Sequence, residues 1–172
     1  MKSIFVGLLV LVFFLGCNKK EKELKALQIE NEKSKAETQQ LETERLLQQI
    51  KDEYRLAEQE IKSIAKFFDA YITDNDALPA DSSLEEMSLN KDYVPFYVKA
   101  IPVYDPWDNK YQFLRSADED KGYFIFSSGS DGIFNGLDQY LDGKWEIGTD
   151  IIWKNNEFVL GLSKAEKRQS KD

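Results

Sequence analysis

The stretch LQQIKDEYRLAEQEIKSIAKFFDAY, residues 47–71, decides the fold. Its apolar side chains recur at alternating steps of three and four: Leu47, Ile50, Tyr54, Ala57, Ile61, Ile64, Phe68 and Tyr71. This spacing places them along one face of an α-helix. We therefore predict a helix whose apolar face packs on a globular core.

The predicted helix extends well before this stretch. Residues 21–73 contain neither glycine nor proline and are rich in the helix formers Glu, Lys, Gln, Leu and Ala. A helix of this length extends about 80 Å, more than a small domain can cover. The apolar register stops before Leu47, because it meets Thr43, Gln40, Ala36 and Lys33. We therefore expect residues 17–46 to form a solvated helical spacer. A homotypic coiled coil through Leu24, Leu27, Leu41 and Leu46 is the alternative, although these leucines keep no heptad over three repeats.

The remaining sequence predicts short elements joined by turns. The turn-forming residues 74–76 and Pro79 should end the long helix. Ser82 and Ser83, followed by Glu85 and Glu86, have the pattern of a capping box at the start of a short helix. Two hairpins are predicted from the β-prone runs Tyr111–Arg115 with Tyr123–Ser127, and Asp150–Trp153 with Glu157–Leu160. The expected fold class is α+β: a long N-terminal helix packed on a small antiparallel β-sheet, with the domain at residues 47–162 and a frayed polar tail at residues 163–172.

The first seventeen residues have the order of an export signal. Lys2 precedes a thirteen-residue apolar run, Ile4–Gly16, which is shorter than the about 20 residues that span a bilayer. The only cysteine, Cys17, follows directly. This arrangement resembles a bacterial lipoprotein precursor, which implies that residues 1–16 are a signal peptide and that Cys17 is acylated. A short anchor, or secretion with a free thiol, is the alternative. In that family an aspartate after the cysteine retains the protein at the inner membrane, so Asn18 favours the outer membrane.

Composition excludes several classes of function. The net charge of −8 and the pI near 4.8 disfavour binding to nucleic acid. The chain has no histidine, and its single cysteine cannot form an internal disulfide. The commonest general base is therefore missing, and SSGSDG is not a nucleophile elbow. We expect no enzymatic activity and no small-molecule substrate.

Three motifs occur in order along the domain. The first is YITDNDALP, residues 71–79, at the end of the long helix, and the second is DPWDNKY, residues 105–111. The third combines SSGSDG, residues 127–132, with TDIIW, residues 149–153. Together these motifs resemble the type II secretion protein G family, the major pseudopilins. Asp76 and Asp108 stand where that family has glycine. The resemblance covers roughly residues 55–160 and implies a pseudopilin-like fold.

The same resemblance implies a calcium site. Calcium takes six to eight oxygen ligands from carboxylates, carbonyls and water. Asp131 and Asp150 are the ligands that the resemblance favours, and Asn135, Asp138 and Asp142 lie between them. The spacing does not meet the EF-hand pattern. An acidic solvated loop without a metal is the alternative.

The expected function is that of a non-catalytic, lipid-anchored protein of the bacterial cell envelope. A pseudopilin keeps its apolar segment after processing, whereas cleavage at Gly16 would discard it. We therefore expect a membrane anchor through Cys17 and contacts with other envelope or secretion proteins. The alternatives are a structural coiled-coil lipoprotein tether and a pseudopilin-like subunit of the secretion apparatus.

Overall fold

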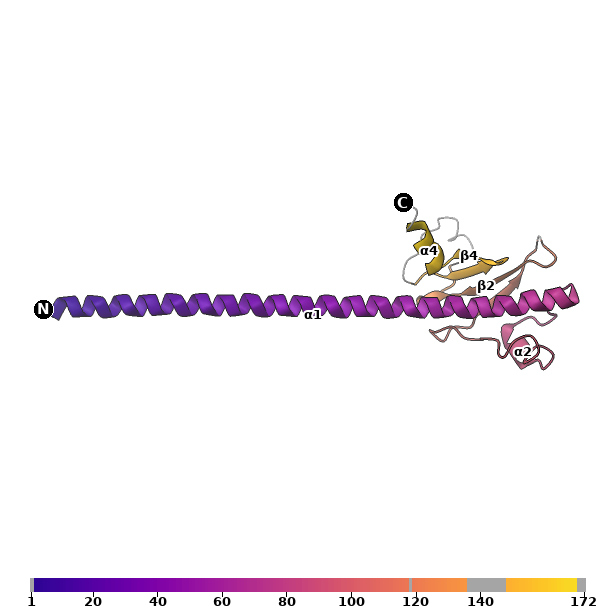
Figure 1. Ribbon diagram of the computed structural model, residues 1–172, viewed down its shortest axis with the longest axis horizontal. Helices are drawn as coiled ribbons and strands as arrows, with labels where there is room; N and C mark the ends of the chain where they lie inside the picture. Colours follow the sequence, from indigo (N-terminus) through magenta and orange to yellow (C-terminus); the bar gives the residue numbers. More distant parts are fainter. Residues whose placement is uncertain (1, 118, 136–147, 170–172) are drawn as a thin grey trace. The chain divides into compact units, whose positions relative to one another are not determined.

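The computed structural model describes the backbone of residues 2–117, 119–135 and 148–169, and the side chains of residues 23–167 within these ranges. The elements in chain order are α1 (Lys2–Asn75), α2 (Leu84–Leu89), β1 (Gln112–Arg115), β2 (Tyr123–Ser127), the 3-10 turn η1 (Gly129–Asp131), β3 (Ile151–Lys154), β4 (Glu157–Leu160) and α4 (Leu162–Gln169) (Figure 1). This is the predicted α+β fold with one long helix and a small antiparallel sheet.

The chain divides into two compact units, Met1–Gln48 and Gln49–Asp172. In the first unit, every described side chain from Glu23 onward is exposed, including the leucines at 24, 27, 41 and 46. Within the described part of the chain, no helix is both long enough and apolar enough to cross a membrane. The spacer role of residues 17–46 stays a prediction.

The second unit is built on a four-stranded sheet in the order β1-β2-β3-β4, with antiparallel pairing throughout. Phe113 of β1 pairs with Ile125 of β2, and Ile125 pairs with Trp153 of β3. All three belong to the same hydrophobic core as the buried side chains of α1. Phe68 of α1 stacks on Phe113 with ring centroids 4.6 Å apart. Aromatic packing thus joins the long helix to the sheet.

The predicted apolar face of α1 is confirmed over most of its length. Its five central members are fully buried: Tyr54, Ala57, Ile61, Ile64 and Phe68. Ile50 and Tyr71 are half-buried, and both pack against the core. Leu47 was predicted to belong to this face, but it is 43% exposed. The packed face therefore begins at Ile50, close to where the second unit starts.

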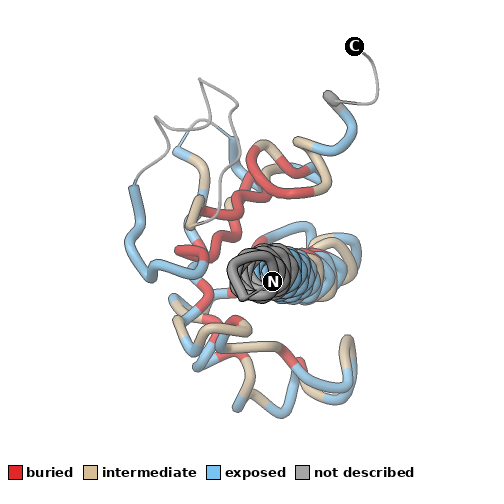
Figure 2. The backbone as a smooth tube through the Cα atoms, turned by 90° about the vertical axis from the view of Figure 1, so that its left-hand side faces the viewer, coloured by how far each residue is buried: buried red, intermediate tan, exposed pale blue. Residues whose placement is uncertain are grey.

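A second side of α1 is also covered. Phe67 lies outside the predicted register, yet it is fully buried. Its ring contacts Tyr93 and Tyr97, which follow α2, with centroids 5.4 and 6.2 Å apart. Figures 1 and 2 show α2 and its flanking segment on one side of the helix and the buried strands on the other. The helix is thus packed between two layers in this unit.

The predicted capping box of α2 forms in a shifted version. Ser83 Oγ accepts a hydrogen bond of 3.2 Å from the backbone N–H of Glu86. The Glu86 carboxylate accepts from the backbone N–H and the hydroxyl of Ser82, at 3.1 and 3.0 Å. In a standard capping box Glu86 would accept from the N-cap residue, Ser83, but here it accepts from Ser82, the residue before the cap.

The prediction of a frayed polar tail at residues 163–172 is wrong for residues 163–169, which belong to α4. Leu162 is only 2% exposed and anchors the first turn of α4 in the core. The Glu58 carboxylate accepts the backbone N–H of Ser163 at 2.8 Å, so a side chain of α1 caps this helix. Arg55 adds an ion pair to Glu166 at 3.0 Å. The polar segment after Leu162 therefore forms a helix because Glu58 and Arg55 of α1 bind its first turn and its Glu166 side chain.

Candidate functional site

The site is built around the turn that follows Tyr104. Asp105 is 4% exposed, and its Oδ1 accepts the backbone N–H groups of Trp107 and Asn109 at 3.0 and 2.8 Å. Asp108 has a φ of 64°, a left-handed conformation that aspartate tolerates. Asp105 thus fixes the DPWDN turn through its own side chain, as an Asx turn does.

The same aspartate connects this turn to the loop after β2. Its Oδ2 accepts the hydroxyl of Ser127 at 2.6 Å, and Ser127 Oγ accepts the backbone N–H of Gly129 at 3.1 Å. Asn109 donates from Nδ2 to the carbonyl of Gly129 at 3.0 Å. Gly129 has a φ of 65°, and an added Cβ would lie 2.5 Å from the carbonyl oxygen of Thr149. Glycine is therefore required where the loop approaches the chain before β3.

Tyr54 of α1 ties the two ends of the loop together. Its hydroxyl accepts the backbone N–H of Gly148 at 2.7 Å and that of Ser130 at 3.3 Å. Its ring lies 4.5 Å from the ring of Trp107, whose indole N–H donates to Glu53 at 2.9 Å. One helix residue therefore contacts all three chain segments of the site.

Three of the predicted metal ligands lie near one another. Asp150 Oδ2 accepts the backbone N–H of Asn135 at 3.0 Å. An added Cβ at Gly148 would lie 3.5 Å from Asp131 Oδ2, so the Asp131 carboxylate lies against the segment that leads to Asp150. Burial raises the pKa of Asp150 to about 6, the hydrogen bond from Asn135 opposes this rise, and the charge of Asp131 adds to it.

The chemistry of this donor set fits a hard cation. Asp150 is fully buried, and its Oδ1 has no hydrogen-bond partner among the described residues. A buried carboxylate oxygen without a partner is costly, and a bound cation would satisfy it. Within the described ranges, however, no group of three or more Cys, His, Asp or Glu residues converges. Asp138 and Asp142 lie outside the described residues, as does the side chain of Cys17.

Reasoning from the sequence missed two residues that organise the site. Tyr54 was assigned to the helix core, and its hydroxyl was given no role. Asp105 was recognised as the start of a turn, but its bond to Ser127 was not foreseen. Asp105 before Pro106, with Asp108 and Asn109 after the tryptophan, indicates the turn. No local pattern indicates a partner 22 positions away.

Comparison with known proteins identifies the domain. The family model for the type II secretion system (T2SS), protein G, matches residues 45–144. The crystal structure of the major pseudopilin from the type 2 secretion system of enterohaemorrhagic Escherichia coli is 24% identical to this chain, with a TM-score of 0.39. That match covers 54% of this chain and 88% of the pseudopilin. No match was found among curated protein sequences.

The family match confirms the resemblance to the protein G family, although TDIIW, residues 149–153, lies beyond the matched residues. It includes the end of α1, the whole DPWDN turn and the SSGSDG loop. More than half of the chain is covered. The chain therefore belongs to the type II secretion system protein G family.

Proposed function

We propose that this chain is a non-catalytic envelope protein, held at a membrane by lipid on Cys17, whose domain contacts other proteins of a secretion apparatus. The observation that carries the anchor is the position of the single cysteine directly after a thirteen-residue apolar run. That run is too short to span a bilayer, whereas a multiply acylated cysteine anchors firmly, because each buried methylene contributes about 0.8 kcal/mol. Asn18 favours the outer membrane as the destination.

Intact mass spectrometry of the native protein, extracted from membranes, tests the anchor. We expect a chain that begins at Cys17 and carries the mass of acyl groups. Cys17→Ser should accumulate with residues 1–16 still attached. Native protein that begins at Met1, or that has an unmodified thiol at Cys17, would refute the lipid anchor while leaving the domain assignment unchanged.

The proposed role in protein contacts rests on membership of the protein G family. Crosslinking in intact cells, followed by mass spectrometry, tests it. We expect crosslinks from residues 49–167 to other proteins of the secretion apparatus. Crosslinks confined to residues 17–48 and to copies of this chain would instead support the coiled-coil tether.

We also propose that Asp131 and Asp150 hold a calcium ion, with Asn135 and Asp138 as further candidate ligands. The buried and unpartnered Oδ1 of Asp150 supports this assignment. Bound calcium would neutralise the two carboxylates and hold the segments 131–135 and 148–150 together. Tyr54 and Asp105 would then orient these segments without contacting the ion.

Isothermal titration and thermal melting test the calcium proposal. Calcium should raise the melting temperature of the wild-type chain, and Asp131→Asn should abolish this rise. Asp92→Asn is the matched control, because Asp92 is an exposed aspartate distant from the loop in sequence. Unchanged melting and no heat beyond dilution at millimolar calcium would refute the site.

A further inference from the structure

A pocket of about 530 Å³ lies between α1, the β3–β4 hairpin and α4. Lys62 lines it from α1, Trp153 and Phe158 from the hairpin, and Lys164 and Lys167 from α4. Its volume falls within the range of pockets that bind small molecules. Every lining residue except Lys62 lies beyond residue 144, where the protein G family match ends.

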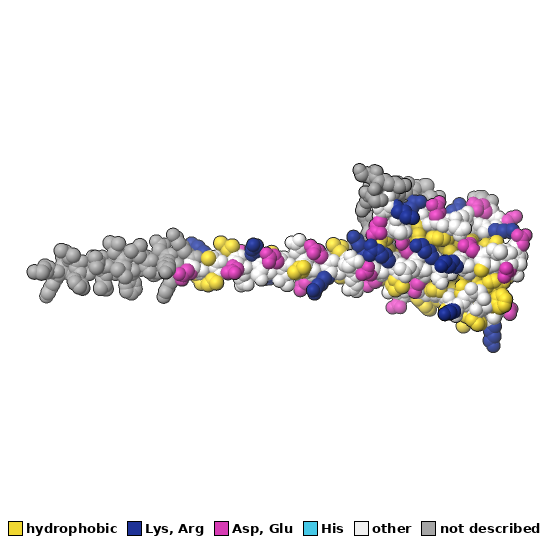
Figure 3. Space-filling model, in the orientation of Figure 1, with side chains coloured by type: hydrophobic (Ala, Val, Ile, Leu, Met, Phe, Trp, Pro, Cys, Tyr) yellow, Lys and Arg dark blue, Asp and Glu magenta, His cyan; other side chains and the backbone are white. Residues whose placement is uncertain are grey.

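The pocket is positively charged although the protein is acidic. Its charged lining residues are three lysines and one glutamate, a net charge of +2 in a chain whose net charge is −8. Glu157 forms an ion pair with Lys164 at 3.3 Å. Figure 3 shows lysine and arginine side chains on this face of the domain, with acidic side chains beside them. Cations converging on one pocket point to an anionic ligand.

The aromatic wall of the pocket positions one of its lysine side chains. The Trp153 and Phe158 rings meet edge to face with centroids 4.7 Å apart. Lys62 Nζ lies 5.2 Å from the centre of the Phe158 ring, a cation–π arrangement that holds one ammonium group at the wall. Asn156 places an amide in the same lining, and this amide can donate hydrogen bonds to an oxyanion. Ser163 also lines the pocket, but its backbone N–H and its hydroxyl bond to the Glu58 carboxylate.

We propose that this pocket binds a phosphate group, carried either by a lipid headgroup or by a small soluble phosphoester. A net charge of +2 attracts an anion, and a phosphate carries one negative charge as a diester and about two as a monoester. Lysine is a common point-charge ligand for phosphate. The aromatic wall gives the remainder of the ligand an apolar surface. The proposal is independent of the lipid on Cys17 and of the calcium loop.

An NMR titration of the full-length chain tests the proposal. The probes are glycerol 3-phosphate, for a soluble source, and dihexanoyl-phosphatidylglycerol, for a lipid headgroup, with dihexanoyl-phosphatidylcholine as the zwitterionic comparison. We expect saturable shifts of the Trp153 indole signal and of the Phe158 and Ser163 amide signals. The double variant Lys62→Gln/Lys167→Gln should bind about tenfold more weakly.

The control variant is Lys66→Gln/Lys91→Gln, which removes two exposed lysines outside the pocket and changes the net charge equally. It should bind as the wild type does. Binding of glycerol 3-phosphate alone supports a soluble ligand, and binding of the phosphatidylglycerol in addition supports a headgroup. Absence of saturable shifts with both phosphate probes, or equal weakening in the two double variants, would overturn the proposal.

Discussion

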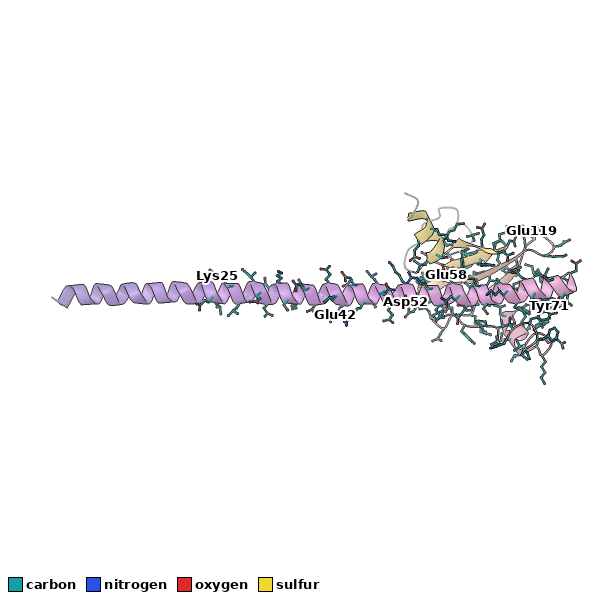
Figure 4. The ribbon with its side chains drawn as sticks, viewed as in Figure 1. Lys25, Glu42, Asp52, Glu58, Tyr71 and Glu119 are labelled. Atoms are coloured by element: carbon teal, nitrogen blue, oxygen red, sulfur yellow. The ribbon has the colours of Figure 1, made fainter. Side chains whose placement is uncertain are left out.

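The backbone N–H of Ser163 donates a hydrogen bond of 2.8 Å to Oε1 of Glu58. The two residues are 105 positions apart in the sequence, and Glu58 is only 3% exposed. Figure 4 labels Glu58 on α1 beside α4. An added Cβ at Gly161 would lie 2.7 Å from the same oxygen, so a larger residue there would displace the Glu58 carboxylate. One buried carboxylate therefore joins the first and last helices of the domain.

Glu58→Gln should reduce the dependence of stability on pH. Burial raises the pKa of Glu58 above its ordinary value of 4.5, while hydrogen bonds from Ser163 oppose this rise. The folded chain thus holds this proton more tightly than the unfolded chain does. Protonation of Glu58 therefore stabilises the fold. This contribution is complete below pH 4.5 and is lost as the pH rises through the pKa of Glu58 in the folded chain. Glutamine keeps the acceptor oxygen and stays neutral, so the stability of Glu58→Gln relative to wild type should increase with pH.

Urea denaturation at a series of pH values measures this difference. Glu42→Gln, which changes an exposed glutamate of the same helix, is the charge control and should follow the wild type. Glu58→Ala should instead lose about 1–2 kcal/mol, because it leaves the Ser163 N–H without its cap. If the stabilities of Glu58→Gln and wild type changed with pH in parallel, burial would not raise the pKa of Glu58.

Asp105→Ala should destabilise the domain by about 2–4 kcal/mol. The substitution removes the acceptor of two backbone N–H groups and of the Ser127 hydroxyl, all in a site where water is largely excluded. Asp92→Ala should change stability by less than about 0.5 kcal/mol, because its side chain is exposed. Guanidinium denaturation measures both. A small effect of Asp105→Ala would mean that the turn forms without its side-chain acceptor.

The sequence predicted those parts of the fold that depend on local patterns. The three-and-four spacing located the packed face of α1, and the Ser82–Glu86 pattern located α2. By contrast, Phe67 and α4 were missed, because each depends on a partner that is distant in the sequence: Tyr93 for Phe67 and Glu58 for α4.

The candidate site shows the same division. Asp131 and Asp150 were named from the motifs and Asn135 from the loop between them, and the structure brings the three residues near one another. The hydroxyl of Tyr54 was missed because a tyrosine in an apolar helical register is expected to contribute only its ring. Its bonds to Ser130 and Gly148 are visible only once α1 is placed against the loop.

Tyr54→Phe should loosen the loop while leaving the core packed. The variant keeps the ring contact with Trp107 and removes the acceptor of the Gly148 and Ser130 N–H groups. We expect faster amide hydrogen exchange at these two residues and a stability loss of about 1–2 kcal/mol. Tyr104→Phe is the control, since Tyr104 is 50% exposed. Unchanged exchange at Gly148 in Tyr54→Phe would exclude the hydroxyl as the tie between the ends of the loop.

Phe67→Ala should destabilise the domain by about 3–5 kcal/mol, although the sequence register placed this residue off the packed face. The ring is fully buried and contacts Phe68, Tyr71, Tyr93 and Tyr97. Its removal would leave a cavity between α1 and the segment after α2. Leu56→Ala, at a position 46% exposed on the same helix, should cost less than about 1 kcal/mol. Chemical denaturation measures both variants. If Phe67→Ala lost as little stability as Leu56→Ala, the second packed side of α1 would contribute little. The face predicted from the three-and-four spacing would then hold the helix to the domain alone.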